Sequence, residues 1–109
     1  MVDRSQLLKG TLDVALLAAL RDEPNYGHGL FAGFADAGLP GLADASVYGA
    51  LRRLELEGML ESELVQSASG PARKYYRLTQ AGTAARREAL QAWEELVEAM
   101  ERILVRSAA

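Results

Sequence analysis

The sequence predicts a mainly α-helical protein with one small β-hairpin. Three observations carry this prediction. Apolar residues recur at helical spacing in three segments before residue 58, two short runs of strand-type residues follow, and the remainder of the chain is again helical in pattern and free of proline. With 109 residues, half of them apolar, the chain is long enough for one domain with a buried core.

The first two helices are predicted from their apolar stripes. Between Gln6 and Pro24 the residues at helical spacing are Leu8, Leu12, Ala15, Leu16 and Ala19. We expect Pro24 to end this helix, because proline disfavours helical backbone in the residue before it. A second, short helix is expected over Tyr26 to Ala37, with an apolar side formed by Leu30, Phe31 and Phe34. Residues 38–44 contain two glycines and a proline and are expected to form a loop.

The third helix is expected to begin near Asp44 or Ser46, since either side chain can accept a hydrogen bond from an early backbone N–H group. Its buried stripe is Val47, Ala50, Leu51 and Leu54. Gly58 is well placed to cap its C-terminus. Residues 59–66 and 73–79 read as the two strands of an antiparallel hairpin, with "SASGPA" (67–72) as the turn. Thr79 is the expected cap of the last helix, which runs from about Gln80 to Val105.

Three helices followed by a β-hairpin is the order of a winged helix-turn-helix. In that fold the third helix enters the major groove of DNA, and the hairpin, or wing, contacts the backbone. We therefore expect residues 1–79 to form a DNA-binding unit. Residues 80–109 are expected to form a C-terminal dimerisation helix packed on the same unit.

Bulk composition excludes several other classes of function. The chain contains no cysteine, which removes disulfides, thiolate metal sites and thiol catalysis and fits a reducing cytoplasm. We see no signal peptide, and the longest apolar run, Val14 to Leu20, is too short for a membrane span. The single histidine, His28, has no recognisable catalytic partner, and there is no glycine-rich phosphate loop or metal-ligand motif. We expect no enzymatic activity, no cofactor, no metal and no membrane association.

The case for DNA rests on local charge, because the net charge of −3 does not favour a nucleic-acid partner. Arg52 and Arg53 lie on the outward face of the third helix, beyond the small residues Ala45, Ser46 and Gly49. The second strand adds three cations, Arg73, Lys74 and Arg77. Two alternatives stay open. The arginines can pair with Glu55 and Glu57 on a solvated face, or the fold can dock a protein instead of DNA, which predicts no salt-dependent DNA binding.

The last helix carries an apolar seam opposite a charged face. Leu90, Trp93, Val97, Met100 and Leu104 are spaced 3, 4, 3 and 4 residues apart, and Leu96 and Ile103 widen the stripe. We expect a second copy of the chain to cover this seam through a two-fold interface, to which Leu8 of the first helix is also assigned. Trp93 offers either an interface anchor or a flat wall for a planar aromatic ligand.

Four segments together resemble the PadR-type transcriptional regulators, and the match runs over nearly the whole chain. They are "LLKGTLDVALLAAL", "PNYGHGL", "SVYGALRRLELEGMLESE" and "GPARKYYRLTQAG". The short length resembles the subfamily with a single C-terminal helix. In the usual pattern a proline follows the tyrosine of the third helix, where this chain has Gly49.

The resemblance implies a homodimeric winged-helix repressor that binds a pseudo-palindromic operator in double-stranded DNA. Carried over by position, it implies DNA-facing roles for Ser46, Tyr48, Gly49, Arg52 and Arg53, wing contacts by Arg73 and Lys74, and phosphate contacts by Lys9 and Tyr26. Some short relatives bind planar drugs between paired tryptophans of the last helix. Trp93 and Val97 are therefore the expected contacts for a small planar hydrophobic ligand.

Overall fold

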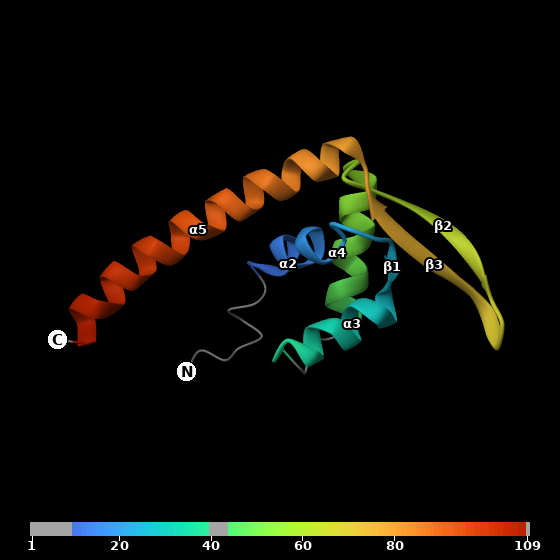
Figure 1. Cartoon of the computed structure of the whole chain (residues 1–109), viewed down its shortest axis with the longest axis horizontal. Helices are drawn as coiled ribbons and strands as arrows, with labels where there is room; N and C mark the ends of the chain where they lie inside the picture. Colours follow the sequence, from blue (N-terminus) through green and yellow to red (C-terminus); the bar gives the residue numbers. More distant parts are fainter. Residues whose placement is uncertain (1–9, 40–43, 109) are drawn as a thin grey trace.

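The computed structural model describes residues 10–39 and 44–108. Four helices and a three-stranded antiparallel sheet are found there (Figure 1), and the mainly helical fold with a β-hairpin is confirmed. In chain order the elements are α2 (Leu12–Ala19), β1 (Asn25–Tyr26), α3 (Gly27–Asp36), α4 (Asp44–Leu56), β2 (Leu60–Ser67), β3 (Gly70–Leu78) and α5 (Gln80–Ala108).

Helix α2 ends earlier than predicted. Its last residue is Ala19, and the Leu20 backbone leaves the helical region, so Pro24 does not end the helix. Leu20 is the last residue of this segment that reaches the core, and exposed polar side chains follow it. Without apolar residues to bury, a further helical turn would gain little from packing. The predicted start of this helix, including Leu8 and Lys9, lies outside the described residues.

A short strand, β1, was not predicted. Asn25 and Tyr26 pair with Tyr76 and Tyr75 of β3, which places β3 between β1 and β2. As a result α3 starts at Gly27 and ends at Asp36, one residue inside the predicted helix at each end. Two residues are too few to show strand alternation, and only the pairing with β3, about fifty residues later in the chain, makes this segment a strand.

Gly58 caps the C-terminus of helix α4, as predicted. The glycine adopts a positive φ of 81°, its N–H group donates to the Glu55 carbonyl, and the Met59 N–H group donates to the Leu54 carbonyl. This is the hydrogen-bond pattern of a Schellman C-cap, which favours glycine because a side chain is strained at that φ. The start of the helix differs from both predicted caps, Asp44 and Ser46. The helix already begins at Asp44, so Ser46 lies inside its first turn.

The hairpin is longer than predicted, and its turn is tighter. Strands β2 and β3 pair from Leu60 with Leu78 out to Ser67 with Gly70, with an irregularity between Val65 and Ser67. Only Ala68 and Ser69 form the turn, so Pro71 is part of β3. The predicted six-residue turn was wrong because glycine and proline also occur near strand ends, where no ladder hydrogen bond is lost.

One apolar core joins α2, α3, α4 and the base of the hairpin. Its buried members are Leu12, Leu16, Leu17, Leu20, Leu30, Phe34, Val47, Ala50, Leu51, Leu54, Leu60 and Tyr76. The stripe predicted on the third helix is wholly inside it. Within the described residues no charged side chain is buried.

Helix α5 leaves the body at a tightly built corner. Thr79 Oγ1 accepts a hydrogen bond from the Gly82 N–H group at 3.0 Å, which confirms the predicted N-cap, and donates to the Gly58 carbonyl at 2.6 Å. A Cβ atom on Gly82 would overlap the Met59 carbonyl oxygen, so the helix passes too close to the end of α4 for any side chain there. From this corner α5 packs on α2 and then continues beyond the other elements (Figure 1).

Candidate nucleic-acid interface

The exposed face of α4 lies opposite its buried stripe. Ser46, Tyr48, Gly49, Arg52 and Arg53 are all exposed, as the sequence predicted, whereas Val47 and Leu51 are fully buried. Glycine and serine near the start of the helix keep its surface low. A helix of this shape can approach the floor of a major groove before its longer side chains meet the groove walls.

Tyr48 packs against Gly27 of the preceding helix, α3. A Cβ atom on Gly27 would collide with the outer ring atoms and the hydroxyl of Tyr48, so the absence of a side chain there makes room for the ring. Gly27 is the first residue of α3 and is buried. The tyrosine is therefore oriented by α3 while remaining 45% exposed.

The two neighbouring arginines have different surroundings. Arg53 Nη2 lies 2.6 Å from Asp13 Oδ1 in α2, and Arg53 Nη1 lies 3.0 Å from Glu57 Oε1 one turn later in α4. Within the described residues Arg52 makes no ion pair or side-chain hydrogen bond. Successive residues of an α-helix point about 100° apart, so Arg53 reaches α2 while Arg52 projects away from the core.

The pKa of the Arg53 guanidinium is raised, first by the hydrogen bond that it donates to Asp13 and then by the one that it donates to Glu57. This effect has no consequence for its charge near neutral pH, since arginine is always protonated there. The two terminal nitrogens of Arg53, Nη1 and Nη2, each already donate to a carboxylate. Of the two arginines, Arg52 has its hydrogen-bonding groups available to an incoming ligand.

Lys74 of the wing is also paired. Its Nζ atom lies 3.1 Å from Glu55 Oε1 in α4, and the other oxygen of Glu55 accepts a hydrogen bond from the Ser62 hydroxyl. One carboxylate therefore ties both wing strands to α4. The hydrogen bond from Ser62 and then the ammonium of Lys74 lower the pKa of Glu55, and the same carboxylate raises the pKa of Lys74.

Arg73 and Tyr26 form a second contact between the wing and the rest of the domain. The guanidinium carbon of Arg73 lies 4.6 Å from the centre of the Tyr26 ring, and the Tyr26 and Tyr75 rings lie 5.2 Å apart. A cation stacked on an aromatic face keeps its N–H groups at the ring edge, where they can still bond phosphate. Tyr26 is thus placed beside a predicted wing contact, a proximity that β1 pairing creates.

The five cations predicted to form a basic surface therefore fall into two groups. Arg53, Lys74 and Arg77 are paired with carboxylates, the last with Glu61 and Glu63 on β2. Within the described residues Arg52 and Arg73 have no carboxylate partner. Sequence reasoning missed Asp13 as part of this surface, and no local signal could have found it, because it lies 40 residues from Arg53.

The apolar seam of α5 changes character along the helix. Leu90 is partly buried near the body, whereas Leu96, Ile103 and Leu104 are 51%, 58% and 56% exposed. Trp93 and Met100 are about 40% exposed and Val97 is half-buried. The predicted seam residues are therefore only partly covered by the described residues of this chain, and exposure is greatest at Leu96, Ile103 and Leu104.

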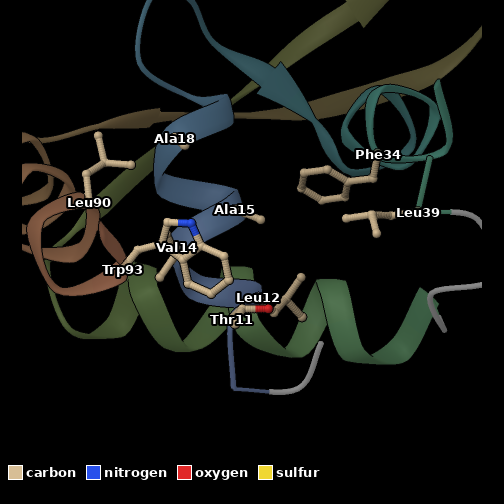
Figure 2. Close-up of a pocket in the computed structure, with 9 residues that line it drawn as sticks. All are labelled: Thr11, Leu12, Val14, Ala15, Ala18, Phe34, Leu39, Leu90 and Trp93. Carbon is tan, nitrogen blue, oxygen red and sulfur yellow. The ribbon is translucent and has the colours of Figure 1, made fainter. Parts of the chain in front are cut away.

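An apolar pocket of about 440 Å³ lies where this stripe meets α2. Figure 2 shows Trp93 and Leu90 of α5 on one side, Phe34 and Leu39 on the other, and α2 between them. The remaining lining residues are Thr11, Leu12, Val14, Ala15 and Ala18. Trp93 was predicted as a ligand contact and lines this pocket. Val97, the other predicted contact, does not.

In the described ranges, 10–39 and 44–108, no helix combines the length and hydropathy needed to cross a membrane. Lys9 and Leu8, assigned from the sequence to DNA and to the subunit interface, fall outside these ranges.

Comparison with known proteins agrees with this architecture. The sequence profile of the Transcriptional regulator PadR-like family matches residues 16–88. A PadR family transcriptional regulator from Eggerthella lenta is 37% identical, with a TM-score of 0.80 over 91% of this chain and 86% of that one. A PadR-like transcriptional regulator from Bacillus cereus is 32% identical, with a TM-score of 0.80 over 92% of this chain and 97% of that one. An uncharacterised protein of Lysinibacillus sphaericus is 27% identical over 100 residues, which cover 90% of this chain and 92% of the relative.

The matched segment includes α4, the wing and the first third of α5, which are the elements that carry the candidate DNA contacts. Members of the matched family are DNA-binding transcriptional regulators and not enzymes. The chain belongs to the PadR-like family of transcriptional regulators.

Proposed function

We propose that the protein is a homodimeric repressor that binds a pseudo-palindromic operator, with Arg52 reading a base. The observation that carries this proposal is the position of Arg52, which is exposed, opposite the buried stripe of α4 and without a carboxylate partner in the described residues. Arginine in that position can donate two hydrogen bonds to the edge of a guanine. Contacts to the DNA backbone come from Arg73 of the wing, from Tyr26 beside it in β1 and, in the DNA-bound state, from Lys74.

The dimer is part of the proposal because a palindromic site needs two recognition helices. The uncovered stripe of α5 supports a two-fold contact in which residues 80–109 of two copies pack together, while residues 1–79 of each bind DNA. The two α4 helices would then enter successive major grooves, roughly 34–36 Å apart.

The test is DNA binding by fluorescence anisotropy, with the DNA upstream of the protein's own gene and a scrambled duplex as probes. Arg52→Ala should weaken binding to the upstream probe by about 1–3 kcal/mol and should bind scrambled DNA almost as well as wild type does. Arg73→Ala should weaken both probes alike, because a phosphate contact carries no sequence information. Arg102→Ala, an exposed arginine on α5, is the matched control and should change neither.

The rival function is a winged helix that docks a protein. Weak binding that is indifferent to sequence, to salt and to Arg52→Ala would support it and overturn the proposal. A reporter gene placed downstream of the bound upstream DNA then distinguishes a repressor from an activator, since a repressor lowers reporter expression.

The pocket at Trp93 favours an effector as a second element of the proposal. Its volume and apolar lining suit a small planar hydrophobic molecule. Such a ligand at the base of α5 would alter the angle between subunits and weaken operator binding by about 1–3 kcal/mol. The probe ligand is anilinonaphthalene sulfonate, and its binding is measured by the quenching of Trp93 fluorescence. Ala18→Leu, which fills the pocket, should abolish quenching, and unchanged quenching would place the dye elsewhere.

A further inference from the structure

Arg52 lies between two cations that are held by carboxylates from different elements. On one flank of α4, Arg53 is bound to Asp13 of α2 at 2.6 Å. On the other flank, Lys74 of the wing is bound to Glu55 at 3.1 Å. Arg52, which has no carboxylate partner within the described residues, thus lies between two paired cations.

Each carboxylate has a favourable interaction besides the one with the cation that it neutralises. Asp13 lies in the first turn of α2, where the helix dipole stabilises a negative charge. Glu55 also accepts a hydrogen bond from the Ser62 hydroxyl. If Arg53 or Lys74 turns towards a phosphate, its carboxylate stays behind at the edge of the interface and opposes the approach of any other phosphate.

The consequence for DNA follows from how cations bind it. Each Lys or Arg that contacts a phosphate adds sequence-independent affinity and steepens the dependence on salt. A cation that must first leave a carboxylate contributes less to this affinity, because one ion pair is exchanged for another. A duplex that Arg52 can contact at a base holds α4 close to the DNA. Its phosphates are then near enough to compete with Asp13 and Glu55 for Arg53 and Lys74.

We propose that Asp13 and Glu55 are specificity-determining residues that withhold Arg53 and Lys74 from sequence-independent phosphate contacts. The inference rests on the proposed function of α4 and the wing in DNA binding. In this arrangement the acids do not contact DNA. They lower the affinity for random sequence more than the affinity for the operator.

The experiment measures anisotropy with operator and scrambled duplexes over a range of salt concentrations, for wild type, Asp13→Asn and Glu55→Gln. Glu55→Gln frees Lys74, and Asp13→Asn leaves Arg53 with Glu57 as its one carboxylate partner among the described residues. Binding to scrambled DNA should therefore strengthen about three- to tenfold near 0.1 M salt, and the salt slope should steepen by up to about one. Operator binding should strengthen less, so the ratio of operator to scrambled affinity falls.

Two controls separate this from a general effect of charge. Glu98→Gln removes the same charge from an exposed position on α5, and should change binding to scrambled DNA less than twofold. In an Arg53→Gln background the Asp13→Asn substitution should have no further effect, because the cation it would release is absent. Thermal unfolding of each variant confirms that the fold is retained.

The inference is overturned if Asp13→Asn and Glu55→Gln have the same salt slopes and the same ratios of operator to scrambled affinity as Glu98→Gln. Equal losses on both duplexes would overturn it too, and would mean that the carboxylates only brace the fold. If Arg52→Ala still weakens operator binding in either case, the proposed function stands and the inference alone fails. If wild type shows no salt-dependent DNA binding, both fail together.

Discussion

Two exposed surfaces of the molecule have different unmet interactions. One is the exposed face of α4 together with the wing, and the other is the apolar stripe of α5. On α4 and the wing three of the five cations have carboxylate partners, and within the described residues Arg52 and Arg73 are the exceptions. On α5 the charged residues face solvent, but large apolar side chains such as Ile103 are more than half exposed. An unpaired arginine on a low helix surface suits a polyanion, whereas an uncovered apolar stripe suits another apolar surface.

The two regions meet at one corner. There Thr79 joins the end of α4 to the start of α5, and Gly82 allows the helix to pass against the Met59 carbonyl. A dimer contact made on α5 would therefore set the position of the wing and α4 relative to the partner's. Substitutions on α5, at this corner and at Glu55 beside the wing test the separate roles of the two regions.

The largest expected effect is on α5. Leu96→Glu/Ile103→Glu should weaken self-association at least about 100-fold, or about 3 kcal/mol, because two carboxylates would have to be buried without partners. Sedimentation equilibrium measures this constant. The matched control is Glu94→Gln/Glu101→Gln on the charged side of the same helix, which should stay within tenfold of wild type. A double-glutamate variant that dimerises as tightly as wild type would move the subunit interface elsewhere.

A smaller effect is expected at the corner. Gly82→Ala should lower the free energy of unfolding by about 1–3 kcal/mol, since the added methyl group meets a backbone carbonyl that cannot move alone. Gly33→Ala in α3 is the control, because its Cβ atom meets nothing within 4 Å and alanine favours the helix. Urea denaturation compares them. If Gly82→Ala is as stable as Gly33→Ala, the corner is not rigid.

The smallest effect concerns pH and the wing. The pKa of Glu55 is lowered by Ser62 and Lys74, so its contribution to stability is present above the ordinary glutamate pKa and is lost as the pH falls through the lowered value. Lys74 is half exposed, so we expect less than about 1 kcal/mol. Thermal unfolding of wild type and Glu55→Gln between about pH 3 and 6 tests this, since the difference should shrink below about pH 4.3. A stability difference that does not vary with pH would mean that the charge of Glu55 does not contribute to stability.

The elements that the sequence predicted well are those stabilised locally. Apolar spacing located the helices, Gly58 and Thr79 marked an end and a start, and the stripe of α4 was found in the core. The errors concern segments whose structure depends on distant partners. Strand β1 exists only through β3, and α2 stops where its side chains cease to reach the core rather than at Pro24.

Some features of the candidate site were also available from the sequence. The outward face of α4, the cations of β3 and the apolar seam of α5 all follow from periodicities of 3.6 and 2 residues, which are properties of the backbone. The exposure of Arg52 and of Ile103 could therefore be predicted without a structure.

Which cation is free, however, was decided only by tertiary structure. In the sequence Arg52 and Arg53 are equivalent neighbours, and Asp13 is 40 residues away. Packing of α2 beside α4 brings Asp13 to Arg53, and pairing of β3 with β2 brings Lys74 to Glu55. Electrostatic partners are chosen by distance in space over a few ångströms, whereas sequence patterns report only which side of an element a residue occupies.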